Sequence, residues 1–362
     1  LMIGFAKATV TTLQERAKNK FSWFTDDQVK SIKTIHKYGR DIACQGKDVF
    51  NQKAKREFIK KLKTDPDNWV LLDTAKDKQD DDVAVWDETT DKKFATIFKL
   101  VGFARHARNK TLEGILNFHS DHEDFKFSRI QRSEIKYCFN NLNLFKKSNS
   151  MIDFEDMLEY ALAPNVHFPE YKVVIVDEVQ DLTPLEWKFI AKLGKSTEEL
   201  YLVGDDDQGI YGWKGSKVDY FLKWPCQEQH ITFLNKTHRL PTKIYDLAQK
   251  IINDIDPAHR IGGKKRENYN PCSKECCNKI NSPGVLETLY ETEELNGIIE
   301  FDSNAIMCAR DWIHCRQYAE HLKGRGIVWK EKNKLRENDG AFRSSFPQKP
   351  RDILKSWDIL KA

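Results

Sequence analysis

The sequence predicts an α/β fold built on a parallel sheet, with a helical segment inserted into it. Residues 173–176 are four consecutive aliphatic residues, and residues 200–204 form a second short apolar run. Continuous aliphatic runs of this length are typical of strands that are covered on both faces, as in parallel sheets. An amphipathic helix predicted over residues 184–193 separates the two runs. This strand–helix–strand order favours a doubly wound domain.

The rest of the chain continues the same alternation, except in one long helical stretch. Residues 1–5 read as a strand, and residues 45–150 are polar with a helical pattern that places Phe98, Leu100, Phe103 and Ala104 on one face. Residues 256–284, rich in Lys, Cys, Asn, Gly and Pro, read as a loop. The further predicted elements are helices at 8–17, 151–162, 241–253 and 311–324, a helix or strand–helix unit at 30–45, and strands at 231–235 and 305–309. At 362 residues we expect more than one domain.

Charge is distributed unevenly along the chain. The net charge is only +4, which does not by itself mark a nucleic-acid-binding protein. Residues 1–63 nevertheless hold 15 Lys and Arg against 6 Asp and Glu, whereas residues 64–93 hold 10 acidic against 4 basic residues. Such blocks are most often solvated faces; the alternative is a basic track for a phosphate backbone. No apolar run is long enough to span a membrane.

Eight cysteines and the absence of a signal peptide favour reduced thiols in a cytoplasmic protein. Cys272, Cys276 and Cys277 form a C-x3-C-C cluster, which suggests zinc. However, no second ligand pair has the spacing that zinc sites usually show, so a set of unligated thiols is the favoured interpretation.

The strongest chemical signal is the run D-E-V-Q-D at residues 177–181, directly after the predicted strand. Ligands in open α/β sheets lie at the carboxyl ends of the strands. There Asp177 could hold Mg²⁺, and Glu178 could accept a proton from a water that attacks a phosphoryl group. The alternative is that these acids serve the next helix, with Asp181 as the N-cap before Pro184.

A second signal is the glycine-rich run at residues 203–215, which follows the next predicted strand. Gln208 offers an amide that can bond a terminal phosphate. Tyr211 and Trp213 suit stacking on the bases of a single strand. The alternative for Trp213 is burial in the core, which the neighbouring Gly212 and Lys214 disfavour.

Together these runs resemble motifs of the UvrD/Rep/PcrA family of superfamily-one DNA helicases. Residues 177–181 resemble the family's Walker B motif, and residues 203–215 resemble its motif III, with Lys214 where Arg is usual. Five shorter segments resemble family motifs more weakly. Within the first 40 residues, T-I-H at 34–36 resembles a DNA-contacting motif and F-A-K-A at 5–8 resembles F-T-x-x-A. Further along, I-D-F at 152–154 resembles the start of a family helix, residues 233–239 resemble motif IV, and residues 306–310 resemble a strand of the second motor domain.

The resemblance implies two RecA-like domains of a P-loop NTPase that use ATP and Mg²⁺. The first domain would comprise residues 1–44 and 151–228, the helical insertion residues 45–150, and part of the second domain residues 229–362. The implied catalytic and nucleotide-binding residues are Asp177 (which also holds Mg²⁺), Glu178, Gln208, His238 and Arg239, with His238 where an adenine-stacking Tyr is usual. The implied DNA-binding residues are Lys7, Thr34, His36, Tyr211, Trp213 and Lys214.

The implied partners are single-stranded DNA and its junctions with duplex, and the implied movement is 3′-to-5′, in repair, replication or recombination. The family also points to a bacterial or viral source.

Two family features are missing from the sequence. It contains no G-x-x-x-x-G-K-[ST] phosphate-binding loop, and the family's closing motifs are absent. We therefore expect an internal part of a longer protein that does not hydrolyse ATP by itself. The alternatives are a nucleic-acid-binding relic without ATP hydrolysis and the helicase subunit of a helicase–nuclease. Asp177, Glu178, Gln208 and Arg239 favour a motor, which requires Glu178 and Gln208 to face a common cleft.

Overall fold

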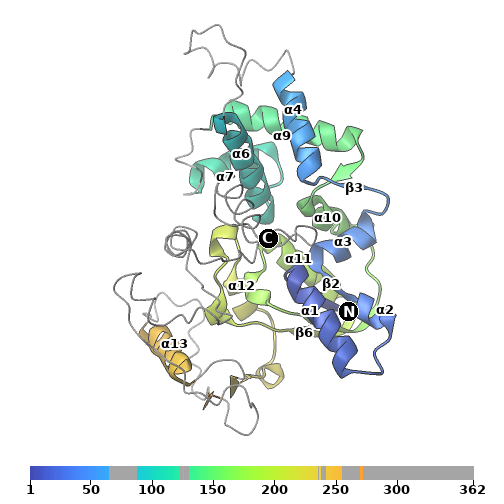
Figure 1. Cartoon of the computed structure of the whole chain (residues 1–362), viewed down its shortest axis with the longest axis vertical. Helices are drawn as coiled ribbons and strands as arrows, with labels where there is room; N and C mark the ends of the chain where they lie inside the picture. The colour runs from blue at the N-terminus through green and yellow to red at the C-terminus, as the bar shows by residue number, and fades with distance from the viewer. Residues whose placement is uncertain are drawn as a thin grey trace, which may run out of the picture. The chain divides into compact units, whose positions relative to one another are not determined.

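A computed structural model describes residues 1–64, 88–122, 125, 130–234, 236–237, 242–254 and 270–271 (Figure 1). The chain divides into two compact units, one formed by residues 1–235 and 249–269 and the other by residues 236–248 and 270–362. Within the part described, no helix is long and apolar enough to cross a membrane.

A parallel sheet of four strands forms the centre of the first unit. Its strand order is β2-β1-β5-β6, and the strands are β1 (Met2–Gly4), β2 (Ile32–Thr34), β5 (Tyr171–Val176) and β6 (Thr197–Leu202). The predicted α/β class with a parallel sheet is therefore confirmed. Because all four strands run the same way, the residues that follow β5 and β6 emerge at one edge of the sheet.

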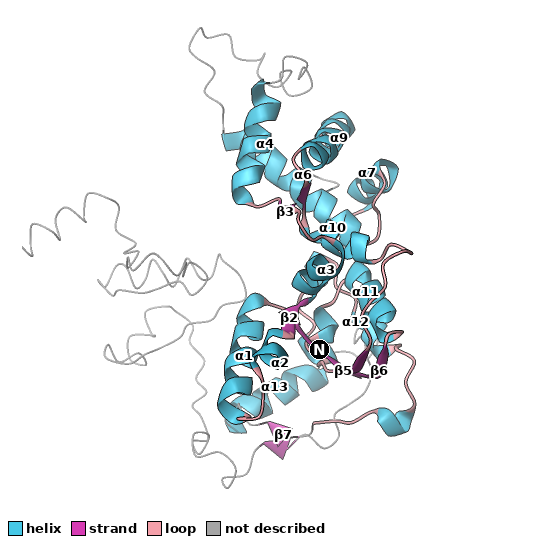
Figure 2. Cartoon of the chain, turned by 90° about the vertical axis from the view of Figure 1, so that its right-hand side faces the viewer, coloured by secondary structure: helices cyan, strands magenta, loops and turns pink. Residues whose placement is uncertain are grey.

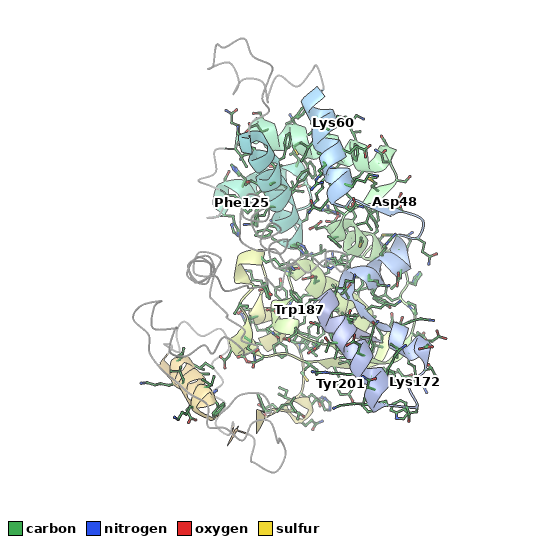
Figure 3. The ribbon with its side chains drawn as sticks, viewed as in Figure 1. Asp48, Lys60, Phe125, Lys172, Trp187 and Tyr201 are labelled. Atoms are coloured by element: carbon green, nitrogen blue, oxygen red, sulfur yellow. The ribbon has the colours of Figure 1, made fainter. Side chains whose placement is uncertain are left out.

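Helices connect these strands and supply the core. They are α1 (Lys7–Lys20), α2 (Asp26–Lys30), α3 (Ile35–Ala43), α10 (Phe154–Ala161), α11 (Pro184–Gly194) and α12 (Val218–Leu222). The largest fully buried side chain is Trp187 of α11, which packs with Ile3, Val174 and Val176 of the sheet (Figure 3). This apolar cluster fixes the strand ends on which the candidate site is built.

The prediction that β5 and β6 are buried on both faces is wrong. In β5, Val174 and Val176 are fully buried, but Val173 is 39% exposed. In β6, Tyr201 is 52% exposed. Alternate residues of a strand point to opposite faces, and only the face of Val174 and Val176 is buried in the part described. The strand β6 is also at the edge of this sheet, so it has one strand neighbour.

The long helical stretch forms a cluster with its own apolar core. Its helices are α4 (Gln52–Thr64), α6 (Glu88–His106), α7 (Leu112–Asp121) and α9 (Arg132–Ser148), which lie together at one end of the first unit (Figure 2). Phe58, Phe94 and Leu100 are among its fully buried residues. The short strands β3 (Asp48–Val49) and β4 (Met151–Ile152) pair in parallel where the chain enters and leaves the cluster.

Several predicted boundaries differ from the observed ones. The helix predicted from residue 151 begins at Phe154, because Met151 and Ile152 pair with β3 and Asp153 caps the helix. The strand predicted at 231–235 is not formed: residues 231–234 have no regular structure, and Leu234 is 80% exposed. An apolar run becomes a strand only where a neighbour pairs with its backbone.

The remaining described elements confirm one prediction. The helix predicted at 241–253 is α13 (Thr242–Asp254). The strands β7 (Lys236–Thr237) and β8 (Asn270–Pro271) form a separate parallel pair. The three clustered cysteines, the elements predicted at 305–324 and most of the loop predicted at 256–284 lie outside the described residues.

Candidate functional site

Asp177 and Glu178 follow the last residue of β5. The N–H of Asp177 donates to the carbonyl of Ile3 at 2.9 Å, which extends the β1–β5 pairing by one residue. Glu178 then adopts a left-handed conformation, with φ 56° and ψ 42°. For a residue with a side chain this conformation costs on the order of 1–3 kcal/mol. It turns the chain into the 3-10 turn Val179–Asp181.

Gln180 links this turn to the loop after β6. Its side chain is buried, with 1% exposure; its Nε2 donates to Glu178 Oε2 at 2.7 Å, and its Oε1 accepts from the N–H of Asp205 at 3.0 Å. Gly204 makes this approach possible, because a Cβ there would lie 2.6 Å from Gln180 Oε1. The carboxylate of Asp205 in turn accepts a hydrogen bond from the amide of Gln208.

Glu178 and Gln208 are therefore the two ends of one hydrogen-bonded chain. Glu178 is half-buried and Gln208 is exposed, so neither is sealed inside the protein. The structure thus links these two side chains through Gln180 and Asp205.

The charges of this turn suit a divalent cation. Burial raises the pKa of Asp177, and the adjacent charge of Glu178 raises it further. Burial and then Glu178 also raise the pKa of Asp181 to about 6. Among the described residues no ion pair involves Asp177 or Glu178. Neighbouring carboxylates without a compensating cation offer the oxygen ligands that Mg²⁺ prefers.

Asp205, Asp206 and Asp207 have carboxylate oxygens within 4.8 Å of one another. Asp205 already accepts hydrogen bonds from Gln208 and from the N–H of Asp207. These contacts explain the cluster as the cap of a short turn, so we assign no metal to it.

A second group of predicted residues surrounds a cavity of about 400 Å³. The Nζ of Lys214 lies 4.8 Å from the centre of the Phe5 ring, and the rings of Phe5 and Tyr211 are 5.3 Å apart. His36 lines the same cavity from the start of α3. Four of the residues singled out in the sequence, although far apart in it, thus lie close together.

Two other predicted DNA-binding residues, Lys7 and Thr34, do not line this cavity. Lys7 is exposed at the start of α1, and Thr34 caps α3, with its Oγ1 accepting from the N–H of Lys37 at 3.3 Å. Thr34 therefore has a structural role that its position alone explains. The side chain of Trp213 lies outside the described residues, as do His238 and Arg239.

The cavity also contains residues that sequence reasoning missed. Phe154 is 57% exposed and meets the His36 ring edge-on at 5.4 Å, and Phe98 and His106 of α6 complete the wall. The I-D-F run predicted the start of a helix. Because Asp153 is the N-cap, Phe154 is the first residue of that helix. An exposed aromatic residue at a helix start was the signal available in the sequence.

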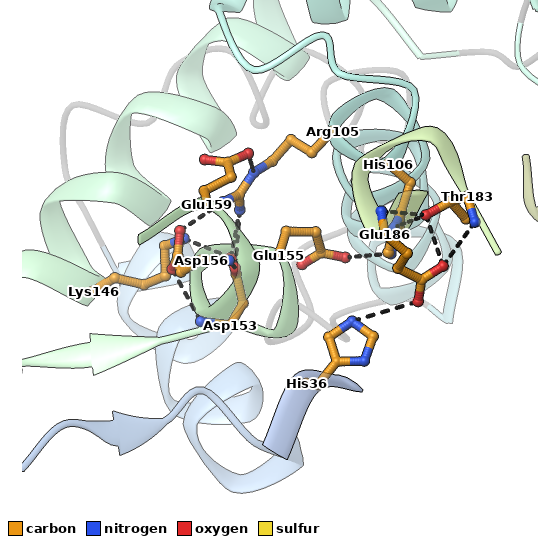
Figure 4. A network of polar contacts seen from close by, with 10 residues as sticks. All are labelled: His36, Arg105, His106, Lys146, Asp153, Glu155, Asp156, Glu159, Thr183 and Glu186. Carbon is orange, nitrogen blue, oxygen red and sulfur yellow. Dashed lines mark hydrogen bonds and ion pairs between the residues drawn. The ribbon is translucent and has the colours of Figure 1, made fainter. Parts of the chain in front are cut away.

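His36, His106, Glu155 and Glu186 form the polar floor of the cavity, and they belong to the network of polar contacts in Figure 4. Glu186 Oε2 accepts from both the N–H and the Oγ1 of Thr183, each at 2.8 Å, while its Oε1 lies 3.9 Å from His36 Nε2. The imidazole of His106 also has two polar contacts. Its Nδ1 is 3.0 Å from Thr183 Oγ1, and its Nε2 is 3.4 Å from Glu155 Oε1.

Thr183, rather than Asp181, is thus the N-cap of α11. Asp181 lies two residues earlier, in the 3-10 turn, too far from the first turn of the helix to cap it.

Beside this floor, Arg105 binds three carboxylates. Its guanidinium contacts Asp153, Asp156 and Glu159 at 2.6–3.1 Å, and Lys146 also pairs with Asp153 and Asp156. Although burial opposes the charge, these carboxylates hold the pKa of Arg105 above its ordinary value. The network ties α6 and α9 to α10 beside the cavity.

Comparison with known proteins finds DNA helicases among the relatives of this chain. The chain is 23% identical over 265 residues to the ATP-dependent DNA helicase Rep of Buchnera aphidicola subsp. Baizongia pistaciae, covering 70% of this chain and 36% of that protein. It is 25% identical over 271 residues to a probable DNA helicase II homolog of Mycoplasma capricolum, covering 73% and 31%. It therefore spans about a third of the length of these relatives.

Residues 1–227 match the model of the UvrD/REP helicase N-terminal domain. This match covers more than half of the chain and includes the turn after β5, the loop after β6 and the residues around the cavity. The chain belongs to the UvrD/Rep helicase family.

Proposed function

We propose that this chain is part of an ATP-dependent DNA helicase that moves along single-stranded DNA. The observation that carries the proposal is the hydrogen-bonded chain from Glu178 through Gln180 and Asp205 to Gln208. It places a carboxylate suited to proton transfer and an amide suited to phosphate recognition at one edge of the sheet, where nucleotides bind in folds of this class.

In this proposal Asp177 would hold Mg²⁺, which would supply positive charge against the phosphates of ATP. Glu178 orients the attacking water and takes its proton, and its left-handed backbone turns it to the edge of the sheet. Gln208 bonds the terminal phosphate. The roles of His238 on the adenine and of Arg239 on the transferred phosphate rest on the family resemblance.

The proposed path of the single strand crosses the cavity near Phe5 and Lys214. Tyr211 and Phe154 offer ring faces to unstacked bases, and Lys214 offers a charge to the backbone. Lys7, Thr34, His36 and Trp213 belong to the same proposed surface by resemblance. Movement from 3′ to 5′, action at junctions with duplex and a role in repair, replication or recombination are proposed on the same basis.

The proposed domain division keeps residues 1–44 and 151–228 as the first RecA-like domain, with residues 45–150 inserted. The separate apolar core of α4, α6, α7 and α9 supports the insertion. Residues 229–362 would begin the second RecA-like domain.

The DNA part of the proposal can be tested with the 362-residue chain. We expect it to bind a fluorescein-labelled oligothymidylate, with affinity that falls as salt rises, because phosphate contacts release counterions. Trp213→Ala should weaken binding about tenfold, since a stacked base contributes roughly 1–3 kcal/mol. The matched control is Trp23→Ala, which removes a tryptophan that is 67% exposed elsewhere. Equal affinity of both variants would argue against stacking on Trp213.

The motor part requires a phosphate-binding loop, which this sequence does not contain. In a protein that includes such a loop upstream of Leu1, Glu178→Gln should abolish DNA-stimulated ATP hydrolysis while leaving ATP binding intact. Hydrolysis at the wild-type rate would exclude Glu178 as the base. A gene that encodes no such loop would instead favour the nucleic-acid-binding relic.

A further inference from the structure

The cavity floor contains an unusual pair of buried polar side chains. The Nε2 of His36 is buried and has no hydrogen-bond partner among the described residues. Glu186 is only 1% exposed, and its Oε1 lies 3.9 Å from this nitrogen, beyond hydrogen-bonding distance. Buried polar atoms are almost always paired, so this gap calls for a functional explanation.

The groups around the pair set the charge of the imidazole. His36 is faced by Glu186 of α11, His106 of α6, Glu155 of α10 and Lys214 of the loop after β6. Burial lowers the pKa of His36, and His106 and Lys214 add to this effect against the two carboxylates. In the state described, His36 is therefore neutral near pH 7.

Glu186, by contrast, remains ionised. Burial acts to raise its pKa, but the charge of His36 when protonated, followed by those of His106 and Lys214 and the N–H of Thr183, outweighs burial and holds the pKa below its usual value. An ionised carboxylate facing Nε2 favours a proton on that nitrogen, and it favours the imidazolium still more. About a fifth of the His36 side chain (19%) remains exposed, so a ligand in the cavity can reach the ring.

We propose that Glu186 is a positioning residue for His36, and that single-stranded DNA binds with uptake of one proton by this pair. The proton comes from solvent and is added to the neutral imidazole. A phosphodiester on the open side and the Glu186 carboxylate on the buried side then both stabilise the imidazolium. This inference rests on the proposed DNA-binding function and adds to it a residue that does not touch DNA.

The first test measures oligothymidylate affinity of the chain between about pH 6 and pH 8, because thymine does not titrate in this range. Uptake of one proton makes affinity rise as pH falls, by at most about tenfold per pH unit. We expect Glu186→Gln and His36→Gln each to remove this component. Gln at position 186 can keep the hydrogen bonds to Thr183, so the helix cap survives. Glu113→Gln is the matched control: it removes an exposed acid from the first turn of α7, another helix with a Thr cap.

An equal pH slope in wild type and Glu186→Gln would overturn the proposal. A calorimetric binding enthalpy of the wild type that is the same in buffers of different ionisation enthalpy would also overturn it. This measurement reports proton uptake directly and needs no variant.

A measurement without DNA separates this proposal from the proposed function. The pKa of His36, followed by NMR of its ring protons, should be lower in Glu186→Gln than in wild type, because the stabilising charge is gone. An unchanged pKa would rule out the role of Glu186. Failure of the chain to bind any oligonucleotide would count against DNA binding as a whole, and with it against DNA-linked proton uptake.

Discussion

Gln180 offers the most direct test of the link between the two candidate catalytic loops. Gln180→Leu keeps the volume of this buried side chain but removes the hydrogen bonds to Glu178 and from Asp205. Each such bond contributes about 0.5–1.5 kcal/mol, so we expect the loop to open more easily by about 2 kcal/mol. Glu178 is half-buried and can be rehydrated, whereas the N–H of Asp205 loses its hydrogen bond to Gln180 Oε1.

Hydrogen exchange measures this effect locally. A loss of about 2 kcal/mol corresponds to roughly 30-fold faster exchange of the Asp205 amide, read by mass spectrometry on peptides spanning residues 197–210. The control is Gln45→Leu, which removes an exposed glutamine that donates only to the carbonyl of Asp41 and should leave these peptides unchanged. Exchange within threefold of wild type in Gln180→Leu would show that the two loops are not held together by this side chain.

Three further variants test other parts of the first unit. Arg105→Met should destabilise the chain to urea by about 3–5 kcal/mol, because it leaves the buried carboxylate of Asp156 and the partly buried one of Asp153 with Lys146 as the remaining cation in the part described; a loss below 1 kcal/mol would contradict this. Asp181→Asn should become more stable relative to wild type as pH rises from 3.8 through about 6. The reason is that folding raises the pKa of Asp181, so the wild type loses stability over this range as the carboxyl group ionises. A pH-independent difference in urea midpoint would be the wrong outcome. Phe154→Ala should weaken oligothymidylate binding about tenfold with little change in stability, because the ring is 57% exposed; unchanged affinity would remove it from the DNA surface.

The loops at the sheet edge could be predicted because local sequence specifies them. The aliphatic run before Asp177 ends abruptly at two acids, and the chain after Leu202 meets glycine and three aspartates, so both strand ends were visible. The cap of α11 was also decidable: Pro184 is the first residue of the helix, and the N-cap is therefore the residue before it, Thr183.

Local sequence could not predict which faces of β5 and β6 are buried. Val173 and Tyr201 belong to residue types that are frequent in strands, but residue type alone does not say which face of a strand another element covers. Burial depends on which helices pack on each face, which is a tertiary property.

The cavity could not be predicted for a related reason. Phe5, His36, Phe154, Glu186 and Lys214 come from five separate segments. No periodicity connects positions so distant in sequence. Only the resemblance to helicases grouped some of them, and it left out Phe154 and Glu186.

The segment from Asp177 to Glu186 joins the two candidate sites physically. It is bound to the loop after β6 at three points: the N–H of Val179 donates to Val203, the N–H of Asp205 to Gln180, and the N–H of Lys217 to Leu182, at 3.0–3.2 Å. Leu182, between the turn and the helix cap, is 2% exposed.

Because these contacts hold the segment at Val179, Gln180 and Leu182, we expect a displacement of Glu178 to move Gln208 on one side and Thr183 with Glu186 on the other. A change at the phosphates would thus reach the proposed DNA surface through ten residues of one packed segment. Loosening it at Gln180 should therefore affect both sites, whereas loosening the Arg105 network should affect the helical cluster and leave the hydrogen bonds between the two loops in place.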